Sequence, residues 1–146
     1  TAGDRRSEFA PRISATGKPV VACHNGQRST GSPWNAAGRL SQGGVIAIEA
    51  LRLRPDDYAF AVTLSGYANP GDLDTDAELA ERRPPVFWGR GALDDVIPPA
   101  LVAHTAQWLP GRVDLSGRVY PDLGHAVSAE ELRDVATFLH KQLPSA

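Results

Sequence analysis

Three residues of this 146-residue chain, Ser41, Asp94 and His125, have side chains that together could carry out nucleophilic catalysis. A serine hydroxyl is a weak nucleophile until an imidazole accepts its proton, and a carboxylate is needed to orient that imidazole. Each residue also has an ordinary structural interpretation. Ser41 alone would be a helix N-cap, Asp94 a turn residue with Asp95 as its rival, and His125 a loop histidine.

The sequence pattern after residue 40 predicts alternating helices and strands, and therefore an α/β fold with a parallel sheet and flanking helices. Residues 68–83 read as an exposed loop with at most one helical turn. A capping box, Ser128 to Glu131, opens the last helix. The expected helices cover residues 43–54, with Ser41 at the start, 99–109 and 128–143; the expected strands cover 58–65, 85–89 and 112–120.

The expected elements place the three candidate residues at one edge of the sheet. Ligands of parallel α/β sheets bind at the carboxyl ends of the strands. Asp94 follows the strand at 85–89, and His125 follows the strand at 112–120. Ser41 is expected at the mouth of a helix, where the backbone N–H of Gln42 would face an oxyanion.

Three motifs in this order resemble the phospholipase/carboxylesterase family of α/β-hydrolases, which includes the acyl-protein thioesterases. They are Leu40-Ser41-Gln42-Gly43-Gly44, Gly91-Ala92-Leu93-Asp94-Asp95-Val96-Ile97-Pro98 and Gly124-His125. The resemblance covers about residues 40–143. It implies that Ser41 is the nucleophile, His125 the general acid and base, Asp94 the orienting carboxylate, and Gln42 the donor of one oxyanion-hole amide. It implies no cofactor.

The segment before the serine departs from the family pattern. A nucleophile elbow reads Gly-x-Ser-x-Gly, but Arg39 stands two residues before Ser41. Residues 1–40 are poorly patterned, and we expect them to be a remnant or a non-native segment, whereas 41–146 form the C-terminal part of an α/β-hydrolase. A short apolar run at 20–23 reads as a strand. The His24 loop after it is either a remnant of the second oxyanion loop or a coincidence.

The composition disfavours several classes of protein. The net charge of −2, from 15 basic and 17 acidic residues, argues against nucleic-acid binding. No apolar run approaches the length of a membrane span. One cysteine, Cys23, excludes an internal disulfide framework and indicates a reducing, cytoplasmic environment. The histidines lack the spacing of metal ligands, so we expect no metal site.

The sequence thus predicts a serine hydrolase that acts on small-molecule carboxylic esters or thioesters through an acyl-enzyme. The alternative is a truncated, catalytically impaired hydrolase fragment that serves as a structural domain. A half-sheet would expose strand edges, so this alternative includes a homodimer.

Overall fold

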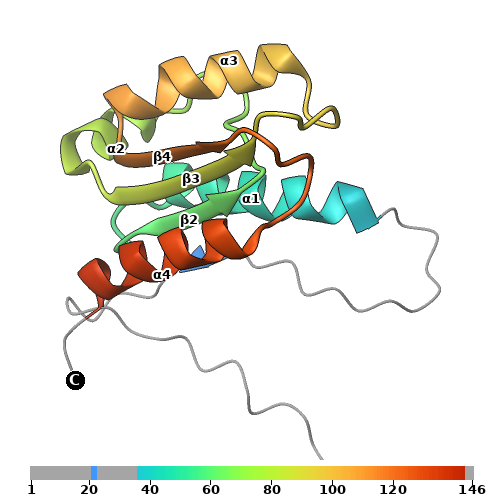
Figure 1. Cartoon of the computed structure of the whole chain (residues 1–146). Helices are drawn as coiled ribbons and strands as arrows, with labels where there is room; N and C mark the ends of the chain where they lie inside the picture. Colours follow the sequence, from blue (N-terminus) through green and yellow to red (C-terminus); the bar gives the residue numbers. More distant parts are fainter. Residues whose placement is uncertain (1–20, 23–35, 144–146) are drawn as a thin grey trace, which may run out of the picture.

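Four parallel strands form one sheet in the computed structural model, which describes residues 21–22 and 36–143, with side chains from residue 42 onward (Figure 1). The strands lie in sequence order, β1-β2-β3-β4, and each neighbouring pair is parallel, as predicted. They are β1 (Val21–Ala22), β2 (Ala61–Leu64), β3 (Pro85–Gly91) and β4 (Asp114–Tyr120). The connecting helices are α1 (Ala36–Leu53), α2 (Asp76–Arg82), α3 (Pro99–Trp108) with a 3-10 turn (Leu109–Gly111), and α4 (Ala129–Gln142).

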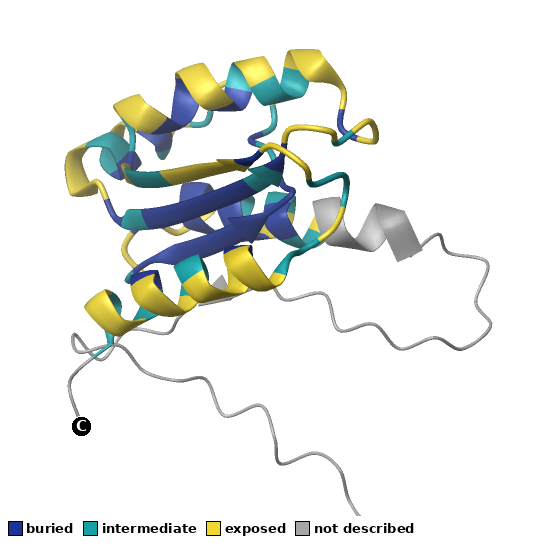
Figure 2. Ribbon diagram, in the orientation of Figure 1, coloured by how far each residue is buried: buried dark blue, intermediate teal, exposed yellow. Residues whose placement is uncertain are grey.

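Alternating apolar residues of β2 and β3 supply both faces of the sheet. Ala61, Val86 and Trp88 face α1 and α3, whereas Val62 and Phe87 face α4. This alternation follows from the two-residue period of a strand. Helices therefore cover β2 and β3 on both sides, and Figure 2 shows these two strands as the most buried part of the molecule.

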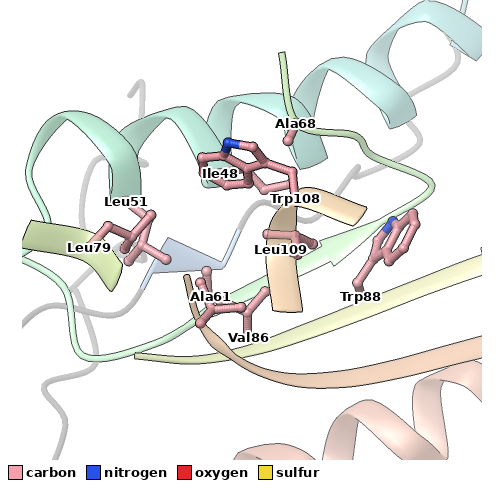
Figure 3. Close-up of a cluster of buried hydrophobic side chains, with 10 residues drawn as sticks. Ile48, Leu51, Ala61, Ala68, Leu79, Val86, Trp88, Trp108 and Leu109 are labelled. Atoms are coloured by element: carbon pink, nitrogen blue, oxygen red, sulfur yellow. The ribbon is translucent and has the colours of Figure 1, made fainter. Parts of the chain in front are cut away.

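Each face has its own hydrophobic cluster. On the α1 side, Ile48 and Leu51 pack with Trp108 and Leu109 (Figure 3). On the α4 side, the ring of Phe138 contacts Phe60 edge-on at a centroid distance of 5.9 Å and Phe87 at 5.8 Å. Edge-to-face contacts of this kind are favourable for aromatic rings. The two clusters hold the helices against the sheet and thereby fix the ends of its strands.

Two predicted elements differ from those observed. Helix α1 begins at Ala36, five residues before Ser41, where the prediction placed its start. Alanine and leucine in this stretch have high helix propensity, and extending an existing helix costs little free energy. Within the predicted loop at 68–83, α2 forms a seven-residue helix instead of a single turn. The remaining predicted elements are found with small shifts at their ends.

The loop before α2 is held by the buried guanidinium of Arg52 in α1. Its Nε donates to Asp76 Oδ1 at 2.9 Å, and its Nη2 donates to Asp76 Oδ2 at 2.8 Å. Nη1 donates to Glu49 at 3.0 Å. The hydrogen bonds from Arg52 lower the pKa of Asp76 against the opposing effect of burial. A lowered carboxyl pKa stabilises the fold above the ordinary Asp pKa, and this stabilisation is lost as the pH falls through the folded-state value.

The same guanidinium also binds the backbone of the loop. Nη1 donates to the carbonyl of Asn69 at 3.0 Å, and Nη2 donates to that of Gly71 at 2.8 Å. Its carbon lies 4.6 Å from the ring centroid of Trp108 in α3, a cation–π distance. Arg52 therefore joins α1, α2, α3 and the loop that follows β2.

None of the helices in residues 36–143 is both long and apolar enough to cross a membrane.

Replacing Arg52 by methionine is expected to destabilise the protein by about 3–5 kcal/mol, since it leaves the Asp76 carboxylate buried without its counter-ion. Urea unfolding followed by circular dichroism measures this loss. Arg54→Met is the matched control, because Arg54 pairs with Asp57 on the exposed surface and we expect no measurable effect there. Similar losses in the two variants would contradict a special role for Arg52.

Candidate active site

Asp94 and His125 meet where β3 and β4 end. Asp94 lies in the loop after β3, and His125 lies in the loop after β4. The Nδ1 atom of His125 is 2.7 Å from Oδ2 of Asp94, and the side chains are only 5% and 6% exposed, respectively. The structure thus brings together two of the three residues that the sequence singled out.

The Asp94 carboxylate is fixed by its own backbone turn. Its Oδ1 accepts hydrogen bonds from the N–H groups of Val96 at 2.9 Å and Ile97 at 3.2 Å. Burial opposes ionisation, but the hydrogen bonds from His125 and from these amides outweigh it, so the pKa of Asp94 is lowered. The rival, Asp95, is exposed to solvent. The aspartate that faces the histidine is therefore Asp94.

An ionised carboxylate can only accept hydrogen bonds, so it favours the tautomer of His125 that carries a proton on Nδ1. The acceptor lone pair of the imidazole is then on Nε2, on the opposite side of the ring. This is the arrangement in which a histidine can take a proton from a hydroxyl group while a carboxylate stabilises the resulting imidazolium.

The two loops that carry this pair are bound closely to each other. The N–H of Ala92 donates to the carbonyl of Tyr120 at 2.8 Å, and that of Leu93 donates to the carbonyl of Leu123 at 2.9 Å. A Cβ atom on Gly91 would lie 2.0 Å from the oxygen of Leu123, a distance at which the loops would have to separate. The absence of a side chain at Gly91 is thus a condition for the Asp94–His125 contact.

Ser41 and Gln42 lie within α1 and not at its start. The side chain of Ser41 is outside the described part of the structure, so its role as nucleophile stays a prediction. Gln42 comes after the first four residues of the helix, whose N–H groups alone lack intrahelical acceptors. Its amide is therefore an interior helical donor in this conformation, and its oxyanion-hole role also stays a prediction. The His24 loop falls outside the described residues.

Gly44, the second glycine after Ser41, allows a close approach between α1 and the end of β2. A Cβ atom at this position would lie 2.5 Å from Oγ1 of Thr63 and 2.7 Å from Cα of Gly66. A side chain at position 44 would therefore push α1 away from the end of β2. Ser65, between these contact residues, has a positive φ of 53°, so the chain turns sharply as it leaves β2.

Sequence reasoning missed a buried carboxyl next to the His125 loop. Glu131 lies in the first turn of α4, and its backbone N–H donates to Ser128 Oγ at 3.1 Å, which is one of the two hydrogen bonds of the predicted capping box; the return bond to the Glu131 side chain is not made. Its carboxyl is fully buried against Gly89, and neither oxygen has a hydrogen-bond partner among the described residues. The capping-box pattern was the signal for this position, but that pattern does not reveal burial.

The pKa of Glu131 is raised to about 7, chiefly because burial penalises its charged form. The charge of Asp134 adds to this effect. The backbone of Ser128 opposes it and lowers the pKa.

Nowhere in the described residues do three His, Cys, Asp or Glu side chains form a group that could hold a metal ion.

Comparison with known proteins relates residues 37–143 to one family. These residues match the family model described as Phospholipase/Carboxylesterase. Acyl-protein thioesterase 1 of Saccharomyces cerevisiae is 30% identical over 112 residues, 74% of this chain and 49% of the yeast protein. A probable carboxylesterase of Oryza sativa subsp. japonica is 27% identical over 113 residues, 73% of this chain and 41% of the rice protein.

Solved structures show the same fold. The crystal structure of Arabidopsis thaliana SOBER1 matches with a TM-score of 0.57 at 22% sequence identity, covering 69% of this chain and 49% of the plant protein. The chain spans about half the length of the curated relatives and solved structures that it matches.

The buried carboxyl of Glu131 predicts a pH-dependent stability. Between its ordinary pKa of 4.5 and about 7, the folded state binds more protons than the unfolded state, so stability falls as the pH rises through this window. Glu131→Gln removes the charge and is expected to raise the free energy of unfolding at pH 8 by up to roughly 3 kcal/mol, with little effect at pH 4.5. Urea titrations at both pH values measure this difference. Glu130→Gln, at the exposed neighbouring carboxyl, is the control and should show no such pH dependence.

Proposed function

Because the chain belongs to the phospholipase/carboxylesterase family of α/β-hydrolases, we propose that it hydrolyses carboxylic esters or thioesters through an acyl-enzyme. The observation that carries this proposal is the buried Asp94–His125 pair at the carboxyl ends of β3 and β4. Ser41 is the nucleophile in this proposal. It holds the position in the chain at which the family motif has its serine.

The reaction proceeds in two halves. His125 accepts the proton of the Ser41 hydroxyl as its oxygen attacks the acyl carbon, and it then donates that proton to the departing alkoxide or thiolate. Water repeats the sequence on the acyl-enzyme and releases the carboxylic acid. Asp94 keeps the imidazole in the reactive tautomer and stabilises its charged form. No cofactor takes part in these steps.

The backbone amide of Gln42 donates to the oxyanion in this proposal. An amide inside a helix is already bonded to a carbonyl four residues earlier. The proposal therefore requires that α1 begins at Ser41 in the reacting state, with residues 36–40 unwound.

Exposed apolar side chains next to Asp94 favour an apolar acyl group in the substrate. Leu93 is 63% exposed and Val96 is 46% exposed, although both are large and apolar. Exposed apolar surface of this kind gains free energy when a ligand covers it, at about 25 cal/mol per Å². An ester with an alkyl chain fits this surface better than one with a charged acyl group.

The path of α1 through Ser41 favours a second candidate function. A helix that runs through Ser41 has neither the strand-to-helix turn of a nucleophile elbow nor a free amide at Gln42. The second candidate is thus a domain that retains the Asp94–His125 pair but does not catalyse hydrolysis in this form.

Replacement of Ser41 by alanine is expected to abolish hydrolysis of short-chain nitrophenyl esters and labelling by a fluorophosphonate probe. Asp94→Asn should lower kcat by about 10³- to 10⁴-fold, because the amide no longer holds the imidazole in the right tautomer. Asp95→Asn is the matched control at the exposed neighbour and should remain active.

Two outcomes would count against the proposal. Turnover that survives Ser41→Ala would exclude the acyl-enzyme. A folded protein, by circular dichroism, that neither reacts with the probe nor hydrolyses the ester would favour the second candidate.

A further inference from the structure

Strand β4 forms an edge of the sheet with one row of backbone groups directed away from β3. The N–H of Asp114 donates to Pro84, and the carbonyl of Tyr120 accepts from Ala92, so these even-numbered residues direct their backbone groups toward the β3 side. Because backbone groups alternate along a strand, those of Leu115, Gly117 and Val119 point outward. No strand in the described part of the chain pairs with them.

This edge is open to solvent. Gly117, Arg118 and Val119 are all exposed, and Val119 is 52% exposed despite its apolar side chain. A Cβ atom added to Gly117 would meet nothing closer than Leu115 at 3.9 Å. Figure 2 shows β4 as largely exposed or half-buried beside the dark, buried β3. A second strand can therefore approach this edge, where it would replace the guanidinium of Arg118 as the partner of the Gly117 carbonyl.

The charges on β4 are arranged symmetrically about Ser116. Asp114 lies two residues before it, and Arg118 lies two residues after it. The carboxylate of Asp114 has no ionic partner among the described residues, and Arg118 donates only to the carbonyl of Gly117, at 2.8 Å. Charged side chains commonly protect an edge strand from pairing. Here their order is self-complementary, because a copy of β4 that runs in the opposite direction presents the opposite charge at each position.

We propose that β4 pairs with β4 of a second copy of this chain, antiparallel and about a two-fold axis beside Ser116. In this register Asp114 faces Arg118 of the second copy, and the same pair recurs across the axis. Directly opposed residues of opposite charge stabilise antiparallel strands. Leu115 and Gly117 of the two copies exchange backbone hydrogen bonds, about four in all. A shift of the axis to Gly117 would set Asp114 against Tyr120 and leave both charges unpaired.

The antiparallel arrangement leaves both candidate active sites accessible. The carboxyl ends of the two β4 strands point in opposite directions, so the Asp94–His125 pairs lie at opposite edges of the joined sheet. The proposal therefore does not depend on the proposed hydrolase activity. An interface built on one strand from each copy is small compared with the ~1,600 Å² of a typical stable complex, so we expect a concentration-dependent dimer.

A charge exchange tests the interface and its register. Sedimentation velocity of the full chain over about a hundredfold concentration range should show a monomer–dimer equilibrium. Arg118→Asp alone or Asp114→Arg alone should weaken the dimer at least tenfold, because each places like charges opposite each other. The double variant Asp114→Arg with Arg118→Asp should restore it. Arg133→Asp, the same charge change at an exposed site on α4, is the matched control and should dimerise like the original chain.

A cysteine at the axis tests the geometry directly. In this register Ser116 lies opposite Ser116 of the second copy in a non-hydrogen-bonded pair. The two Cα atoms are then about 4.5 Å apart, which is within the range for a disulfide. In a Cys23→Ser background, Ser116→Cys should form a covalent dimer on mild oxidation, whereas Thr137→Cys on α4 should not. The proposal is overturned by a monomer at all concentrations, by a dimer that is indifferent to the single charge reversals, or by failure of the double variant to reassociate.

Discussion

The parallel pairing of β3 with β4 is the constraint on which the candidate site depends. Gly91 lies opposite Tyr120 at the ends of these strands, so the loops that follow leave the sheet side by side. The carbonyl of Leu123 approaches the position that a side chain of residue 91 would occupy. A carboxylate and an imidazole 31 residues apart in sequence are brought to 2.7 Å by this contact and by the hydrogen bonds between the loops.

Two buried ionisable residues near the sheet, Arg52 and Glu131, differ in how the free-energy cost of their burial is offset. Burial of an ion costs free energy unless hydrogen bonds and counter-charges compensate for it. Arg52 has two carboxylates, two carbonyls and an indole ring around it, so it holds a loop in place. Glu131 has no such partners in the described part of the chain, and it remains buried at neutral pH because its carboxyl can keep a proton. The first arrangement stabilises the α1 side of the sheet, and the second weakens the α4 side as the pH rises.

Much of the C-terminal part could be predicted from the sequence because its signals are local. The Ser128 cap acts at the start of α4, and Pro99 stands in the first turn of α3, a position that proline favours. The family assignment from three short motifs is confirmed by the match over residues 37–143. Of the two neighbouring aspartates, Asp94 is the one that contacts His125. Its Oδ1 atom accepts hydrogen bonds from the backbone N–H groups of Val96 and Ile97.

The features that were missed depend on contacts between distant residues. Arg52 lies in the predicted helix at 43–54, but its partner Asp76 is 24 residues away in a stretch predicted to be an exposed loop. The burial of Glu131 depends on Gly89 in β3. In both cases the residue type is visible in the sequence, whereas the partner or its absence is decided by packing between elements.

The start of α1 decides how the candidate nucleophile relates to the acid–base pair. From Gly44 onward the helix is fixed, because its backbone packs against Gly66 with no room for a side chain. Two residues before Ser41, Arg39 occupies the position at which a nucleophile elbow has glycine. A non-glycine residue there disfavours the tight turn and favours continuation of the helix, which accounts for its start at Ala36. Any rearrangement that frees the Gln42 amide is thus confined to the first two turns of α1, and it leaves the sheet, the α1 core contacts and the Asp94–His125 pair unchanged.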